Sequence, residues 1–440
     1  MPGTLGAEKG RTHFFYGWVV VALSFADLAL LCGVWYGFSA FVLAFTREFG
    51  WSRASISSVF ALNMALYGFS GPAVGFLLDR FGVRRVMPAG AGLLALGLFL
   101  SSRVQTLNEL YLTYGVIAGL GGSFLGSIPH NTIVSNWFQE KRGTALGITS
   151  SGMGAGMLLF IPLIQYIILH RGWREAYFMM SILAGLMVPI ILIFQRHRPA
   201  DMGLAPDGKI GSEDAPISKF SRPKVRIVDP HWASRDWTVR MSLDTMRFWA
   251  LFVSFTLFAF AVQIVLIHQI AYLETLQFDS MRAASVLGIV GLVSSLAKFG
   301  WGTLSDFLGR EKTFTLGMAS LVLGLGALML LPFYNPEFLT LLYVIFFGMG
   351  YGVGNPVGFS MAADLFQGKH LGAVLGILGL GIGLGCSVGP WMAGWLYDLS
   401  RSYHLAFGLA GVATALSCAG AWIAAPAKIR GIGRRVGALS

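Results

Sequence analysis

Residues 75–82 read GFLLDRFG, and residues 302–309 read GTLSDFLG. The two stretches share two glycines, a leucine and an aspartate at an offset of 227 residues. A second pair, FQEK at 138–141 and FQGK at 366–369, lies 228 residues apart. The next identities follow at an offset of 229. Because this drift needs only single-residue insertions, the sequence predicts an internal duplication.

The composition predicts that the repeated halves lie in a membrane. Hydrophobic residues make up 55% of the 440 residues and charged residues only 12%, whereas soluble domains average about a quarter charged. A membrane-spanning helix needs about 20 mostly apolar residues. Twelve such runs are predicted, six in each half, near residues 16–45, 54–78, 86–103, 109–135, 143–168, 175–195, 248–273, 283–304, 313–332, 338–362, 371–396 and 404–425.

Six spans in each half is an even number, which predicts two parallel repeats that face each other across a central cavity. The predicted fold is therefore all-α, and the glycines recurring in 152–156 and 381–385 are expected to allow close helix packing. The stretch between the halves contains five prolines and no long apolar run, so it is a linker. The predicted organisation is an N-terminal half at 1–195, a linker at 196–247, a C-terminal half at 248–425 and a tail at 426–440.

The basic residues predict the orientation. If both termini are cytoplasmic, 24 Lys and Arg residues fall on the cytoplasmic side, 7 on the opposite side and one, Lys298, within a span. This bias follows the positive-inside rule and predicts a multi-pass protein of the plasma (inner) membrane. The net charge of +11 is spread over short loops rather than gathered on one face, so nucleic-acid binding is not expected.

The repeated loop motif resembles that of a known family. Residues 75–85 follow the pattern G-x3-D-R-x-G-x-R-R, which is similar to the cytoplasmic loop between the second and third helices of the major facilitator superfamily. The copy at 302–310 is degenerate. The resemblance covers essentially the whole chain and implies alternating access by rocking of the two halves. A carboxylate at a helix end can pair with a loop arginine, so a gating role is expected for Asp79, Arg80, Arg84, Arg85, Asp306 and Arg310.

A narrower resemblance is to the monocarboxylate transporter family and its bacterial relatives. Residues 16–20 (YGWVV) are similar to its glycine–tryptophan signature, and residues 136–147 to its aromatic–basic loop before the fifth helix. By this resemblance, Lys298 matches the position of the family arginine that binds the substrate carboxylate. The lysine keeps the positive charge but lacks the bidentate fork of an arginine. The chain departs from the family at Phe38, where animal members carry a lysine, and at Ser294, where a carboxylate is usual.

Lys298 is the most informative single residue. It lies roughly 12 Å, or two helical turns, inside Asp306 and within an apolar run. A buried ammonium is costly unless it is paired or faces a water-filled cavity, although a long lysine can instead extend to the interface. The duplication places Gly71 at the corresponding position, so only one half carries the charge. A fixed cation in the cavity predicts an anionic substrate.

Other polar residues within the spans are candidate partners of the substrate or of a proton. Asp27 lies roughly 16 Å into the first span. It either takes up a proton, because burial disfavours the charged form, or pairs with Lys298 in the empty site, or has no role. The histidines are either packing groups or proton carriers. The residues expected to bind substrate are Lys298, Tyr36, His130, Asn131, His268 and Asn355.

The sequence favours transport over catalysis. It carries no Cys/His cluster with metal spacing and no Walker motif, so no metal, no cofactor and no enzymatic activity are expected. The resemblance and Lys298 together predict a secondary transporter of a small organic anion, with a monocarboxylate and a proton as the expected cargo. Efflux of amphipathic drugs and a sensor that transports nothing are the alternatives. One chain encloses a complete pathway, so a monomer in the lipid bilayer suffices.

Overall fold

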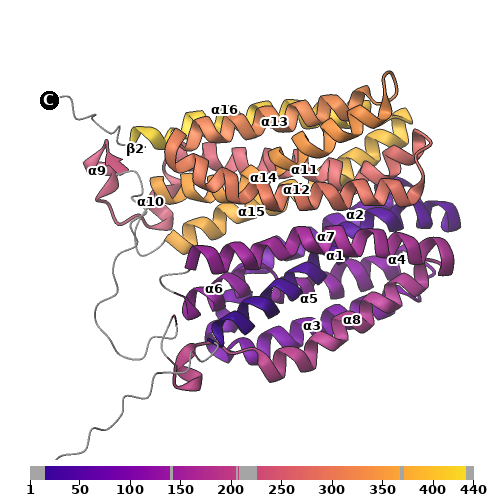
Figure 1. Ribbon diagram of the computed structural model, residues 1–440, viewed down its shortest axis with the longest axis horizontal. Coiled ribbons are helices and arrows are strands. Elements are labelled where there is room, and N and C mark those ends of the chain that lie inside the picture. Colours follow the sequence, from indigo (N-terminus) through magenta and orange to yellow (C-terminus); the bar gives the residue numbers. More distant parts are fainter. Residues whose placement is uncertain (1–14, 139–141, 205–206, 208–224, 367–370, 433–440) are drawn as a thin grey trace, which may run out of the picture.

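The computed structural model describes residues 15–138, 142–204, 207, 225–366 and 371–432. Its long helices run side by side in two groups, shown one above the other in Figure 1. The N-terminal group contains α1 (Gly17–Phe49), α2 (Arg53–Phe81), α3 (Val83–Ser101), α4 (Leu107–Leu110), η1 (Tyr111–Ala118), α5 (Gly119–Phe124), α6 (Ser127–Trp137), α7 (Arg142–Arg171) and α8 (Trp173–Phe194). The C-terminal group contains α11 (Met246–Thr275), α12 (Ser280–Leu308), α13 (Arg310–Leu330), α14 (Pro336–Leu365), α15 (Leu371–Ser400) and α16 (His404–Ala424).

Each predicted span coincides with one helix or, for residues 109–135, with a series of helices, and the ends differ by no more than four residues. Eleven of these segments are long and apolar enough to cross a membrane by length and composition. The other segment, α2, is 29 residues long and packs along α15 in the bundle. The helical series is irregular, because the π-helical η1 follows α4, and the chain leaves helical geometry at Leu125 and Gly126 before α6.

The described parts of the linker lie at one end of the bundle, which we call the linker end; the opposite end is the far end (Figure 1). Its short elements are η2 (Pro199–Met202), β1 (Val225–Ile227), α9 (Pro230–Ala233), α10 (Val239–Leu243), η4 (Pro426–Lys428) and β2 (Arg430–Ile432). Strands β1 and β2 pair antiparallel. Trp232 of α9 donates through Nε1 to the Leu365 carbonyl at 2.7 Å, and its ring centroid lies 4.4 Å from that of Trp237. These contacts dock the second part of the linker onto the C-terminal half.

The glycines that end the repeated motif have a backbone reason. Gly82 joins α2 to α3 with φ 74° and ψ 162°, and Gly309 joins α12 to α13 with φ 97° and ψ 154°. This region of backbone space is open essentially only to glycine. The duplication therefore preserves a sharp helix–helix turn in both halves.

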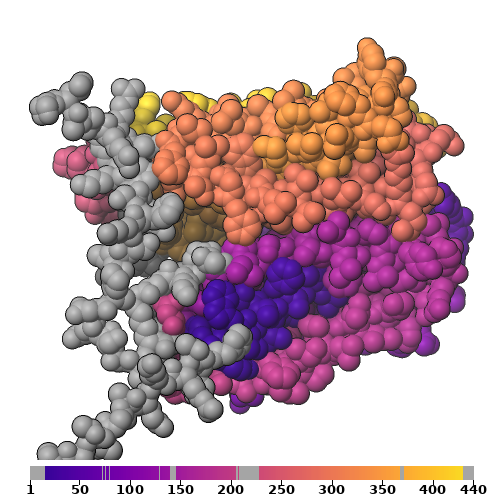
Figure 2. Space-filling view, viewed as in Figure 1, coloured from indigo at the N-terminus to yellow at the C-terminus, as the bar shows by residue number. Residues whose placement is uncertain are grey.

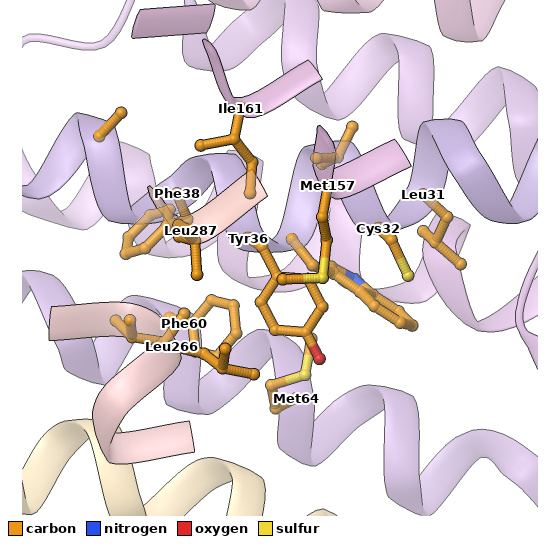
Figure 3. Packing of buried hydrophobic residues seen from close by; sticks show 14 of the residues in the cluster. Leu31, Cys32, Tyr36, Phe38, Phe60, Met64, Met157, Ile161, Leu266 and Leu287 are labelled. Atoms are coloured by element: carbon orange, nitrogen blue, oxygen red, sulfur yellow. The ribbon is translucent and has the colours of Figure 1, made fainter. Parts of the chain in front are cut away.

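The two halves meet along two seams, α2 against α15 and α7 against α12. A Cβ atom added to Gly68 of α2 would lie 3.0 Å from the Cα of Gly383 on α15. Within the N-terminal half, Gly152 and Gly156 of α7 lie directly against the backbone carbonyls of α1. The expectation that these glycines allow close packing is confirmed. Figure 3 shows buried side chains of both halves meeting around Tyr36.

Candidate functional site

Lys298 lies on α12, half-buried, where both halves come together. Its Nζ is 5.5 Å from the centroid of the Tyr351 ring on α14. Cys32 on α1 lies in the neighbourhood of this ammonium. Among the residues that the structure describes, no carboxylate oxygen lies within 4.0 Å of this ammonium. An ammonium held by an aromatic face and not by a carboxylate keeps its charge available for an anion.

Tyr36 of α1 and Tyr351 of α14 connect the two halves beside Lys298. Their hydroxyl oxygens are 3.0 Å apart. Nε2 of Gln263 on α11 donates to the Tyr36 hydroxyl at 3.4 Å, whereas its Oε1 is buried without a hydrogen-bond partner in the described part of the chain. This central cluster, defined as Lys298, Tyr36, Tyr351 and Gln263, offers an ammonium, two hydroxyls and an amide. These donors suit a carboxylate.

Asp27 and His130 form a second buried group, inside the N-terminal half. The Asp27 side chain on α1 is 1% exposed and that of His130 on α6 is 0% exposed, with Nε2 of the imidazole 3.9 Å from Oδ2 of the carboxylate. The two carboxylate oxygens have no hydrogen-bond partner within the described residues, and the His130 ring has only a loose backbone contact, with the Leu125 carbonyl. The titratable neighbour of Asp27 in this structure is thus His130, and Asp27 forms no ion pair with Lys298.

His268 lies outside the central cluster, near the far end. Its Nε2 is 2.9 Å from the Pro390 carbonyl oxygen and 3.2 Å from Oγ of Ser57, and its Nδ1 is 3.1 Å from the Tyr403 hydroxyl. Because a carbonyl only accepts, we assign the ring proton to Nε2, so Nδ1 accepts from the tyrosine. Ser57 belongs to the N-terminal half and the other two partners to the C-terminal half, so His268 links the halves.

Arg53, the first residue of α2, extends this link. Its guanidinium donates to the Tyr403 hydroxyl and lies 3.8 Å from the centroid of the Tyr397 ring. The carboxylate of Asp398 on α15 accepts from the backbone amides of Arg53 at 3.3 Å and of Ala54 at 2.9 Å. A carboxylate stabilises the free amides and the positive dipole of a helix N-terminus. The halves are therefore held together at this end by a far-end network, which we define as Arg53, Ser57, His268, Asp398 and Tyr403.

The linker end is more open. Asn131 on α6 and Asn355 on α14 are both exposed. Figure 2 shows the surface hollowed between the two halves towards this end. The six residues expected to bind substrate are thus divided: Lys298 and Tyr36 share the central cluster, His130 sits with Asp27, His268 joins the far-end network, and the two asparagines are exposed.

The charged loop motif forms a network within the C-terminal half. Arg310 at the start of α13 pairs with Asp306 of α12 at 2.7 Å and with Asp364 of α14 at 3.0 Å. In the first copy, Arg84 donates to the Leu192 carbonyl of α8 at 3.1 Å, and Arg80 and Arg85 are exposed. The side chain of Asp79 lies outside the described residues, as do parts of the motifs at 136–147 and 203–208.

Sequence reasoning missed several residues of these networks. Gln263 could have been found, since it is a polar residue in the middle of an apolar run. No such signal marks the other residues. The tyrosines Tyr351 and Tyr403 lie among many packing aromatics, and Asp398 resembles any other charge near the end of a helix. In the described chain there is no group of three or more His, Cys, Asp or Glu residues that could hold a metal ion.

Comparison with known proteins accounts for nearly the whole chain. The family model described as Major Facilitator Superfamily matches residues 23–356 and 335–435. The chain is 26% identical over 396 residues to monocarboxylate transporter 13 of Bos taurus, covering 90% of this chain and 86% of that protein. It is 26% identical over 343 residues to the oxalate:formate antiporter of Oxalobacter formigenes, covering 76% of this chain and 74% of that protein.

Solved structures share the fold. A bacterial homologue of the human lysosomal transporter Spinster, in an inward-facing and unoccupied conformation, superimposes with a TM-score of 0.65 at 14% identity, covering 94% of this chain and 95% of that one. A nucleoside transporter gives a TM-score of 0.67 at 15% identity, covering 92% of this chain and 99% of that one. The matched family and the transporters similar to this chain identify a transporter and not an enzyme, and the chain belongs to the major facilitator superfamily.

Proposed function

We propose that this protein is a secondary active transporter of a small organic anion, with a monocarboxylate as substrate. The observation that carries this proposal is Lys298, an ammonium where the halves meet, 5.5 Å from the Tyr351 ring and without a carboxylate within 4.0 Å among the described residues. The substrate carboxylate would supply the missing negative charge. The hydroxyls of Tyr36 and Tyr351 would donate to its oxygens.

The named relatives support the same substrate class. Monocarboxylate transporter 13 and the oxalate:formate antiporter carry small carboxylates by name. The central cluster has one cation and a few neutral donors, which suits a singly charged anion.

We further propose alternating access between two moving halves, residues 1–195 and 248–425, joined by the 196–247 linker. The far-end network supports a state that is closed at the far end, and the hollow between the halves supports an opening at the linker end. With both termini in the cytoplasm of an inner membrane, that opening faces inward. Rocking would break the far-end contacts, and the motif charges Asp79, Arg80, Arg84, Arg85, Asp306 and Arg310 would help to close the linker end.

Transport in this proposal is coupled to a proton, and a monomer is sufficient. A monocarboxylate and a proton together carry no net charge, so their joint movement avoids taking an uncompensated charge through the membrane. Each chain contains both halves (Figure 1), so one chain would enclose the proposed pathway. The surrounding lipid bilayer is the only other partner that this mechanism needs.

The test is uptake of radiolabelled formate, acetate and lactate into proteoliposomes, with an imposed pH gradient present or absent. Lys298→Ala is compared with the wild type and with Lys312→Ala, which removes an exposed lysine at the linker end. We expect Lys298→Ala to lower uptake at least tenfold, because a hydrogen bond to a charged group is worth about 1.5–3 kcal/mol. We expect Lys312→Ala to leave uptake within about twofold, because an exposed charge contributes little. Normal uptake by Lys298→Ala would contradict the assigned site, and no uptake of any anion by the wild type would contradict the substrate class.

A further inference from the structure

The Asp27–His130 pair lies apart from the donors that suit a carboxylate. Both side chains are buried in the N-terminal half, whereas Lys298 and Gln263 belong to the C-terminal half. A carboxylate buried without hydrogen bonds is strongly disfavoured in its charged form. A structural role would normally satisfy these atoms, because buried polar groups almost always have partners. Both oxygens of the Asp27 carboxylate are without such a partner among the described residues, whereas the His130 ring lies near the Leu125 carbonyl. A buried carboxylate left open in this way, beside an imidazole, instead suits a group that gains and loses a small cation.

The backbone beside the pair is irregular, which is an independent sign of a binding site. The fourth membrane segment changes from the π-helical η1 to α5 and leaves helical geometry at Leu125 and Gly126, one turn before His130. Broken and π-helical segments within the membrane recur where transporters bind ions, because such backbone is tolerated only next to protein or water. The broken segment fixes His130 opposite Asp27 of the continuous helix α1.

From these observations we propose that Asp27 and His130 form a proton-binding site, separate from the central cluster, that couples proton movement to anion transport. This inference rests on the proposed function. Protonation forms one O–H bond on the Asp27 carboxylate and converts it to a neutral acid, and the proton returns to water on the opposite side when the acid dissociates. No electron transfer is involved, and His130, at 3.9 Å, needs only a small approach to donate to or accept from the carboxyl group.

A proton fits this site better than a sodium ion. Ser24, one turn earlier on α1, and Thr149 on α7 also carry buried hydroxyls without partners in the described part of the structure. Oxygen atoms of this kind could ligate a hard cation. The imidazole beside the carboxylate argues against that, since nitrogen is a poor ligand for such ions but a good proton donor and acceptor.

Few other ionisable groups face the pair, so its pH response can be assigned. On α2, the Tyr67 ring lies against Gly126. On α3, which packs against α6, Arg84 donates to the Leu192 carbonyl and Arg85 is exposed. On α7, which packs against α1, residues 145–169 carry no Asp, Glu, Lys, Arg or His. Within the described residues, His130 is the basic side chain found within 4.0 Å of Asp27.

Helix α1 connects the proton site to the anion site. Cys32 lies five residues after Asp27, about 7.5 Å along the helix, and Tyr36 lies about 13.5 Å along it. Cys32 lies in the neighbourhood of Lys298, and the Tyr36 hydroxyl forms a hydrogen bond with that of Tyr351 in the opposite half. A change of charge at Asp27 that shifts α1 would therefore reach the central cluster through one rigid element.

The experiment uses the full chain in proteoliposomes and compares two modes of transport with radiolabelled formate, acetate, lactate and oxalate as probes. Counterflow exchanges anion for anion and needs no net proton movement, whereas uptake driven by a pH gradient does. The variants are Asp27→Asn, His130→Gln and, as a control, Asp279→Asn, which changes a carboxylate that caps α12 within one half. We expect counterflow by Asp27→Asn to stay within about twofold of the wild-type rate. We expect its gradient-driven uptake to fall at least tenfold. We expect His130→Gln to shift the pH midpoint of that uptake, and Asp279→Asn to behave like the wild type.

Each other outcome overturns a defined part of the reasoning. Gradient-driven uptake that survives in Asp27→Asn, or an unchanged pH midpoint in His130→Gln, would overturn the proton site. Loss of counterflow together with uptake in a stably folded Asp27→Asn would show that the two sites are not separate. If the wild type shows counterflow and its net uptake follows a sodium gradient, the coupling ion is sodium and not the proton. Absence of counterflow in the wild type with every probe would instead overturn the proposed function on which the site rests.

Discussion

Asp398 caps a helix of the opposite half at the far end, so in the proposed alternating access its replacement should shift the balance between the two access states. Its carboxylate accepts from the amides of Arg53 and Ala54 at 3.3 and 2.9 Å. In Asp398→Asn the side chain keeps one acceptor oxygen but loses its charge and its second acceptor. Both losses fall only on the state in which α2 and α15 are in contact at the far end.

The size of the shift follows from helix-cap energetics. Loss of a capping interaction costs about 0.5–2 kcal/mol, and loss of a favourable charge at a helix N-terminus costs about 0.3–1 kcal/mol. These two estimates overlap, so we expect a combined loss of about 1.5 kcal/mol. Since about 1.4 kcal/mol corresponds to a tenfold change, the ratio of far-end-open to far-end-closed molecules should rise about tenfold.

The assay is double electron–electron resonance between spin labels at Asn108 and Tyr334, two exposed far-end residues, one in each half. The three natural cysteines are replaced in every variant. Asp279→Asn is the matched control, because Asp279 accepts from the amides of Met281 and Arg282 within its own half. We expect a longer-distance population to grow in Asp398→Asn only. An unchanged distribution, or an equal change in the control, would refute the view that this cap holds the halves together.

Three further predictions concern the central cluster, the glycine packing and the linker. Tyr351→Phe removes a hydroxyl 3.0 Å from that of Tyr36 and should weaken anion affinity roughly two- to tenfold in a transport titration, because a hydrogen bond contributes about 0.5–1.5 kcal/mol; unchanged affinity would exclude that hydroxyl from the site. Gly156→Ala places a methyl group against the Ala29 carbonyl and should destabilise the fold by about 1–3 kcal/mol, which lowers the melting temperature. The control Gly411→Ala, on an open face, should melt like the wild type. Trp232→Ala removes the bond to the Leu365 carbonyl and should speed limited proteolysis of residues 225–247 about tenfold, since an anchoring aromatic contributes of the order of 1–2 kcal/mol; equal cleavage rates would mean that other contacts hold the linker.

The helices were predictable from the sequence because each is defined by local properties. A run of about 20 apolar residues has no stable place other than a membrane-spanning helix, and all twelve predicted runs coincide with helical segments. The glycine motif was equally readable, since Gly82 and Gly309 occupy turns that need positive φ. The irregular course of residues 107–137 was not predicted, because a π-helical stretch and a break leave the apolar content of the segment unchanged.

The candidate site was only partly predictable. Lys298 is visible in the sequence because a charge within an apolar run is expensive. Its neighbour Tyr351 is not, since one tyrosine among 13 gives no sign of facing a lysine 53 residues earlier. Both His268 and Lys298 were predicted to bind substrate, His268 as a polar residue within a span and Lys298 as a charge within an apolar run. The structure separates them, because His268 is committed to Ser57, Pro390 and Tyr403.

The sequence by itself predicted the long apolar helices, an internal repeat between the two halves, and a lysine within a span. These features depend on hydrophobicity, repetition and charge along the chain, which tertiary contacts do not alter. Only the tertiary structure decided that Asp27 lies beside His130 and that Asp398 caps α2. Both pairings join helices that are distant in sequence, and their geometry follows from how the helices pack, which a linear pattern of polar residues does not encode.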